Sequence, residues 1–237
     1  QNGQYTRTRD MDAVIPAWEE LLSCFGVHIE LGLIHFVDAV AEFDRIMTGP
    51  FIEYVRAEKG AGRIDHIGIS THNPEVALRA AETPDIEMIM FSINPAYDML
   101  PASEDINDLF KDEYQAGLEN MDPQRKRLYS LCEENGVGIT VMKPFAGGRL
   151  FDAGKSPFGV AMTPVQACHY CLTRPAVASV LAGFRDVEGC AGCLAYETAD
   201  DTAKNYASIL AGAPQHAYFG NCIYCGHCQP CTVGINI

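Results

Sequence analysis

The stretch HIGISTHNPEVALRAAE, residues 66–82, contains the transition that decides the fold. Its first part, His66–Ser70, is short and apolar, as is typical of a buried strand. Asn73, Pro74 and Glu75 then supply a helix cap, a proline at the first helical position and an acid in the first turn. The sequence therefore predicts a buried strand followed at once by a helix over residues 75–82.

The same alternation recurs along the chain. Strand-like runs occupy residues 29–36, 87–93, 137–142 and 178–182. Helical patterns cover residues 11–24, 39–59 (broken at Gly49-Pro50), 123–134, 164–173 and 187–195. Strands that are apolar on both faces and alternate with helices indicate an α/β fold with a parallel sheet. An eight-stranded TIM barrel and an open doubly wound sheet both fit, but no GxGxxG follows any strand, which disfavours the second.

The composition is that of a globular protein, with 48% apolar and 20% charged residues in 237. The formal net charge of −14 argues against nucleic acid and anionic membranes as partners. No apolar run approaches the roughly 18 residues of a membrane span, and no secretory signal pattern opens the chain. Half of the net charge falls within Asp98–Asp122, an acid-rich insertion predicted to be either an active-site lid or a solvated loop.

Four of the ten cysteines are evenly spaced near the end of the chain, at Cys222, Cys225, Cys228 and Cys231. Three equal two-residue gaps suit a [4Fe–4S] cluster, in which each iron takes one thiolate. Structural zinc is the second interpretation, because zinc usually joins two separated Cys-x-x-Cys pairs. The pattern predicts a metal-binding segment over residues 212–237, a preceding domain over 1–211, and a reducing, cytoplasmic location.

The other cysteines admit two interpretations. Cys168-x2-Cys171 and Cys190-x2-Cys193 have zinc-ribbon spacing. Both pairs fall on predicted helices, however, and free cysteine is a frequently buried residue. We therefore favour core packing over zinc for these four, and predict that Cys24 and Cys132 also lie in the core.

Three segments and the cysteine tail together resemble the aldo-keto reductases, in the branch that carries a C-terminal iron–sulfur motif. The segments are LGLIHFVD at 31–38, GRIDHIGIS at 62–70 and VMKPFAGG at 141–148. The resemblance implies a TIM barrel that interconverts a small-molecule carbonyl and alcohol with NADPH or NADH. It matches His35 to the family's catalytic histidine, which orients and polarises the substrate carbonyl.

The resemblance also implies a set of cofactor contacts in the segments that follow the strands. These positions are Ser70, Thr71, Ser92, Met142, Lys143, Gly147, Gly148, Gly183 and Arg185. Ser70 matches the residue that binds the nicotinamide carboxamide, Lys143–Gly148 the loop near the pyrophosphate, and Arg185 a charge partner of the adenosine phosphate. Asp186 stands where a phosphate-binding hydroxyl is common, so the preference for NADPH over NADH stays open.

The family's proton-donating tyrosine and its lysine have no counterpart in this sequence. Only five of the eight strand–helix units of a barrel are found, so we expect an N-terminally truncated, incomplete barrel. The edges of its first and last strands are expected to be uncovered or borrowed from a partner. We expect the fragment to be inactive alone. Two rival functions remain: an electron-transfer protein on a barrel scaffold, with a redox partner protein, and a non-catalytic binding protein with structural zinc.

Overall fold

The computed structural model describes residues 8–26, 28–99 and 121–210. Its strands are β1 (Ile29–Ile34), β2 (Ile64–Thr71), β3 (Met88–Ser92), β4 (Gly138–Met142) and β5 (Val177–Val180). Its longer helices are α1 (Met11–Phe25), α2 (Val40–Thr48), α3 (Pro50–Gly60), α4 (Pro74–Ala81), α7 (Pro123–Asn135), α8 (Pro164–Leu172) and α9 (Val187–Leu194). Shorter helical segments are α5 (Pro95–Met99), η3 (Ala146–Phe151), η4 (Ala195–Thr198), α10 (Asp201–Lys204) and α11 (Ala207–Leu210).

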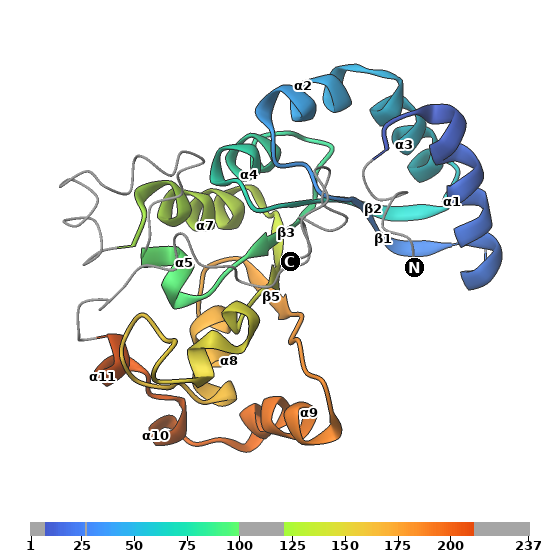
Figure 1. Ribbon diagram of the computed structural model, residues 1–237. Helices are drawn as coiled ribbons and strands as arrows, with labels where there is room; N and C mark the ends of the chain where they lie inside the picture. Colours follow the sequence, from blue (N-terminus) through green and yellow to red (C-terminus); the bar gives the residue numbers. More distant parts are fainter. Residues whose placement is uncertain (1–7, 27, 100–120, 211–237) are drawn as a thin grey trace, which may run out of the picture. The chain divides into compact units, whose positions relative to one another are not determined.

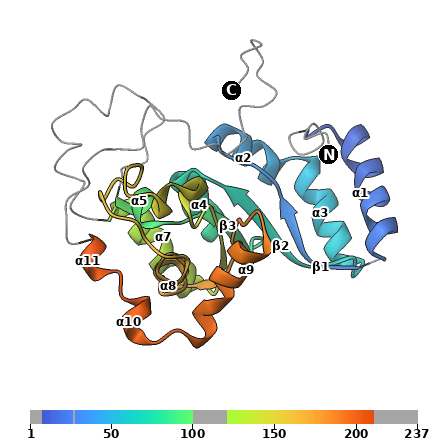
Figure 2. The same cartoon turned by 60° about the horizontal axis from the view of Figure 1, so that its bottom comes forward.

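The strands form one five-stranded sheet in the order β1-β2-β3-β4-β5 (Figure 1). The pairs β1–β2, β2–β3 and β3–β4 are parallel, and β1, β2 and β3 lie side by side in both views (Figure 2). The predicted α/β fold with a parallel sheet is confirmed. The five described strands do not close into a barrel, and the first and last of them are the ends of the sheet, as expected.

The burial of each strand depends on its position in the sheet. Most residues of the central strands β2 and β3 are buried, because both faces of these strands are covered. Helices α3 and α4 pack on β2, α4 also contacts β3, and α7 contacts β4. The end strands β1 and β5 are far less buried, and Leu31 on β1 is 50% exposed.

The helices begin where their capping residues predict. Asn73 accepts a hydrogen bond from the Glu75 backbone N–H at the start of α4, at 2.9 Å. Thr163 and Gln166 form a reciprocal capping box at the start of α8. Gly49-Pro50 separates α2 from α3, because proline begins a new helix more readily than it continues one.

The chain divides into two compact units. Unit 1 comprises Gln1–Ser92, Pro123–Met142 and Arg174–Ser179, and therefore holds most of the sheet. Unit 2 comprises Ile93–Asp122, Lys143–Thr173 and Val180–Ile237. Its core includes Phe145, Leu150, Phe158 and Met162.

Two sequence-based expectations are wrong. Cys24 is exposed rather than in the core, because α1 buries Leu22 and a residue two positions further on points off that face. Asp98 does not belong to a solvated loop: it lies on α5, is fully buried and accepts a hydrogen bond from the Tyr170 hydroxyl at 2.8 Å. Residues 100–120 of the acidic insertion lie outside the described part.

Candidate functional site

The carboxyl ends of four strands bring together five of the sequence-predicted site residues within unit 1. Ser70 and Thr71 end β2, and Ser92 and Met142 are Cα partners at the ends of β3 and β4. His35 directly follows β1 and is exposed. In parallel α/β folds this edge of the sheet carries the functional residues.

The turn after β1 holds a strained backbone. Phe36 has φ 58°, a left-handed conformation that is unusual for a bulky side chain. Its N–H donates to the Ser70 hydroxyl oxygen at 2.7 Å, and the next N–H, of Val37, donates to the Ser70 carbonyl at 2.9 Å. Backbone strain of this kind persists where neighbouring groups fix it, and it is frequent at functional sites.

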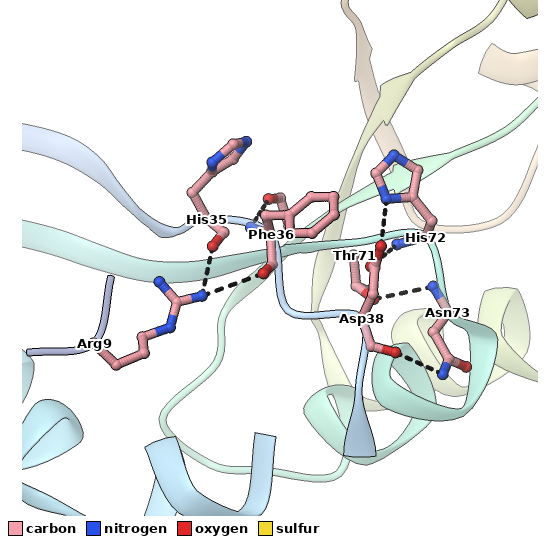
Figure 3. A network of polar contacts seen from close by, with 8 residues as sticks. Arg9, His35, Phe36, Asp38, Thr71, His72 and Asn73 are labelled. Atoms are coloured by element: carbon pink, nitrogen blue, oxygen red, sulfur yellow. Dashed lines mark hydrogen bonds and ion pairs between the residues drawn. The ribbon is translucent and has the colours of Figure 1, made fainter. Parts of the chain in front are cut away.

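Arg9 also binds the turn after β1. Its guanidinium donates to the carbonyl oxygens of His35, at 2.7 Å, and of Phe36, at 3.2 Å (Figure 3). Glu42 on α2 forms an ion pair with Arg9 at 3.1 Å. Arg9 comes just before α1, so its link to residues 35 and 36 is non-local and no sequence pattern indicated it.

A carboxylate–histidine pair lies beside this turn. Asp38 Oδ2 is 3.0 Å from His72 Nδ1, and Asp38 Oδ1 accepts from the His72 backbone N–H at 2.7 Å (Figure 3). The Thr71 hydroxyl also donates to Asp38 Oδ1, at 3.0 Å, and Asn73 Nδ2 donates to the Asp38 carbonyl. The hydroxyl of Thr71, a predicted cofactor contact, is thus engaged with Asp38.

These contacts set the charge of Asp38. Partial burial alone raises the pKa of its carboxyl. Hydrogen bonds from the His72 ring, the His72 backbone N–H and the Thr71 hydroxyl, with the attraction of the His72 charge, outweigh that effect and hold the pKa below its ordinary value. Asp38 is therefore an ionised acceptor at neutral pH. No sequence pattern indicated a role for Asp38, because its partners Thr71 and His72 lie at the end of another strand.

Ser92 is buried, and its carbonyl oxygen accepts a hydrogen bond from Arg125 on α7. The Arg125 guanidinium also lies over the Phe91 ring, 4.5 Å from its centroid. Arg125 is only 3% exposed, so a buried cation lies behind this end of β3. The sequence carried no signal for it, because its partners are on another element.

The remaining predicted cofactor residues belong to unit 2. The loop after β4 has positive φ angles at Lys143 (60°), Ala146 (47°), Gly147 (68°) and Gly148 (86°). Asn94 fixes its start by donating to the Lys143 carbonyl at 2.9 Å. Gly147 and Gly148 are exposed, and a Cβ on Gly148 would meet no atom within 4 Å.

Gly183 and Arg185 lie on an exposed segment between β5 and α9. Asp186 caps α9, accepting from the Gly189 N–H at 2.8 Å. This contact gives the Asp186 carboxylate a structural role at the position where the resemblance implied a phosphate-binding hydroxyl.

The cysteines of the described part do not form a metal site. No group of three or more His, Cys, Asp or Glu side chains placed to hold a metal occurs among the described residues. Cys132, Cys168 and Cys171 are buried, and burial raises the pKa of Cys132 to about 12 and, as the largest cause, that of Cys168 to about 11. Core packing of these three is confirmed. The predicted ligands Cys222, Cys225, Cys228 and Cys231 lie outside the described residues.

Solved structures share this arrangement. The aldo-keto reductase AKR11C1 from Bacillus halodurans, in its holo form, is 21% identical with a TM-score of 0.58, over 87% of this chain and 69% of that one. A putative aldo-keto reductase from Pseudomonas aeruginosa is 16% identical with a TM-score of 0.52, over 79% and 58%. The chain has the aldo-keto reductase fold. A putative 2,5-diketo-D-gluconic acid reductase B is 14% identical with a TM-score of 0.53, over 84% and 62%.

This chain therefore spans between 58% and 69% of the length of these three aldo-keto reductase structures. No sequence model of a protein family matches it, and no curated protein does. Among the described residues, no helix is long and apolar enough to cross a membrane.

Proposed function

We propose that this protein is an oxidoreductase of the aldo-keto reductase type, which interconverts a small carbonyl compound and its alcohol with NADPH or NADH. One observation carries the proposal. On a sheet with the fold of these enzymes, His35, Ser70, Ser92 and Met142 gather at the carboxyl edge, around a turn whose strained Phe36 is fixed by Arg9 and Ser70.

Each unit, taken by itself, offers residues whose chemistry suits part of a nicotinamide dinucleotide. A serine hydroxyl accepts one hydrogen bond and donates another, so Ser70 can hold the Phe36 N–H and also bind a carboxamide. The exposed, left-handed Gly148 leaves the space beside its backbone open, as close approach to a pyrophosphate requires. When bound, the cofactor supplies the hydride equivalent of the reaction, and His35 orients the carbonyl that receives it.

Cofactor affinity tests this function. Arg185 is exposed, so Arg185→Gln is expected to fold normally and to weaken NADPH binding about tenfold, the effect of losing one charge-assisted contact. The affinity for NADH, which lacks the 2′-phosphate, is expected to fall by a smaller factor in the same variant. The measurement is a fluorescence titration of each reduced cofactor into the wild type and the variant.

Arg127→Gln is the matched control, because Arg127 is an exposed arginine on α7 that pairs with Glu134. It is expected to bind both cofactors like the wild type. If neither cofactor bound in a saturable way, the proposed function would be wrong. If Arg185→Gln and Arg127→Gln bound NADPH equally well, the role given to Arg185 would be wrong.

The proposal includes a [4Fe–4S] cluster on Cys222, Cys225, Cys228 and Cys231, and its support is the spacing of these cysteines alone. Protein purified without oxygen is expected to be brown and to contain about four iron and four sulfide per chain. Cys225→Ser is expected to lose most of both. Exposed Cys24 provides the control, since Cys24→Ser should retain them. Zinc without iron in the wild type would contradict the cluster.

A further inference from the structure

Two thiols of unit 2 lie in contact with each other. Cys168 is on α8 and Cys193 is on α9, and the Cys168 S–H donates a hydrogen bond to the Cys193 sulfur. The two helices pack together, and Cys193 lies against the hydrophobic core that contains Cys168. A Cβ on Gly192 would be 3.6 Å from Pro164 Cγ, so α9 also lies close to the start of α8. Both cysteines are reduced, and the fold holds their sulfur atoms together.

The two thiols differ in access to solvent and in pKa. Cys168 is 5% exposed, whereas Cys193 is partly exposed. Burial is the largest cause of a raised pKa at both cysteines, and it brings the pKa of Cys168 to about 11. The charge of Cys190 also raises the pKa of Cys193, but the hydrogen bond from Cys168 lowers it. Cys193 is therefore the thiol that meets a dissolved reagent first and loses its proton more readily.

This environment favours the oxidised state of the pair. A dithiol resists oxidation when one of its sulfurs is a stabilised thiolate, because that stabilisation belongs to the reduced form. Burial opposes the thiolate form of both Cys168 and Cys193, so the reduced form lacks this advantage. Two sulfurs that the fold already holds in contact also react as an intramolecular pair, at a high effective concentration.

Helix α9 would gain most from a covalent link at this place. The structure describes all of α9, and none of its residues is buried. Val187 is 85% exposed and Leu194 is 63% exposed. A helix with few buried contacts opens at a low free-energy cost. A bond from Cys193 to the buried Cys168 would hold α9 on α8.

We propose that Cys168 and Cys193 form a reversible disulfide that ties α9 to α8, with a small-molecule disulfide as the oxidant. The Cys193 thiolate attacks one sulfur of the oxidant, whose S–S bond breaks, and a mixed disulfide forms as one thiolate leaves. Cys168 then loses its proton and attacks the Cys193 sulfur, which expels the second thiolate. The two protons of the protein thiols end on the two released thiols, so the cysteines are oxidised and the oxidant is reduced. This inference does not depend on the proposed oxidoreductase function.

Cys190 is the competing partner for Cys193. It precedes Cys193 by three residues on α9, so a bond between these two would stay within one helix and would not tie α9 to α8. The hydrogen bond between the Cys168 and Cys193 thiols favours Cys168 as the partner. The two products contain different peptides, so mapping of the disulfide distinguishes them.

Disulfide mapping of the whole chain tests the pair. The reduced protein is incubated with oxidised glutathione, its remaining thiols are alkylated, and it is digested without reduction for mass spectrometry. Most chains are expected to contain a peptide pair joined through Cys168 and Cys193, in Cys190→Ser as in the wild type. Cys193→Ser is expected to lose this peptide pair.

Two other cysteines serve as internal controls. Exposed Cys24 forms only an intermolecular mixed disulfide, which is expected to disappear in an about 100-fold excess of reduced glutathione, whereas the Cys168–Cys193 bond should persist. Cys132, which is buried on α7, is expected to stay a thiol throughout. A Cys190–Cys193 bond as the main product, or Cys168 and Cys193 that stay as reduced as Cys132, would overturn the proposed pair.

Hydrogen exchange measures the effect on α9. Oxidation is expected to slow the exchange of the α9 backbone amides at least tenfold in the wild type, because the link removes local opening. The same treatment should leave the exchange of Cys193→Ser unchanged. A Cys168–Cys193 bond that forms without slower exchange in α9 would overturn the tie between the helices. The mapping and the exchange of the wild type decide the proposal even where a variant does not fold.

Discussion

Glu58→Ala is expected to lower the free energy of unfolding of unit 1 by about 3 kcal/mol, because hydrogen bonds to a charged, buried acceptor are lost. The Glu58 side chain on α3 is 3% exposed. Its Oε2 accepts from Trp18 Nε1 on α1 at 2.6 Å and from Arg63 Nε at 2.5 Å, and Arg63 Nη2 donates to Oε1. The loss is expected to loosen α1 in particular.

Trp18 is the single tryptophan of the chain, so its fluorescence reports on this contact directly. Urea unfolding followed at Trp18 gives the measurement, with an unchanged slope indicating a change in stability alone. Glu53→Ala, on an exposed position of the same helix, is the control and should change stability by less than about 0.5 kcal/mol. Equal stabilities of Glu58→Ala and Glu53→Ala would contradict the account of α1.

The same carboxylate makes stability depend on pH. Hydrogen bonds from Arg63 are the largest influence on the pKa of Glu58 and lower it. Burial raises this pKa, and the hydrogen bond from Trp18 lowers it further, so that the pKa lies below its ordinary value of 4.5. A lowered pKa in the folded state adds stability above the unfolded-state pKa, and this part is lost as the pH falls through the folded-state pKa. Stability is therefore expected to fall below about pH 4.5, and less steeply in Glu58→Gln.

Arg125→Ala is expected to cost about 3 kcal/mol of stability, through the lost bond to the Ser92 carbonyl, the lost cation–π contact with Phe91 and the space left in the core. Arg125→Lys keeps the charge but not the planar guanidinium, so it is expected to lower the stability by less than Arg125→Ala does. The check is denaturant unfolding with circular dichroism.

Arg127 again provides the comparison, because it lies two positions further along α7 and is exposed. Arg127→Ala is expected to change stability by less than about 0.5 kcal/mol. If Arg125→Ala were no more costly than Arg127→Ala, the buried cation would contribute nothing to the end of β3.

Local patterns were enough to predict the elements of the fold. Asn73-Pro74-Glu75 and Gly49-Pro50 act on their own backbone, so the start of α4 and the break between α2 and α3 followed from the sequence. The sequence also predicted that Ser70 and Ser92 lie at the same edge of the sheet, because parallel strands end on the same side.

Contacts between distant residues could not be predicted in this way. Arg9 reaches a turn 26 residues away, and Asp98 pairs with Tyr170 across 72 residues. The acid-rich composition around Asp98 even indicated solvent exposure, since an average over a segment hides one buried member. The exposure of Cys24 could not be predicted for a similar reason. It depends on which face of α1 packs against the rest of the protein, and the contact between Trp18 and Glu58 fixes that face.

The most direct test of the proposed function is transfer of a label from the cofactor to the product. The protein is incubated with a small aldehyde or ketone and reduced nicotinamide cofactor that carries deuterium at both C4 positions, and the alcohol is analysed by mass spectrometry. The account predicts one deuterium on the carbinol carbon of the alcohol. Alcohol that forms without deuterium would contradict it.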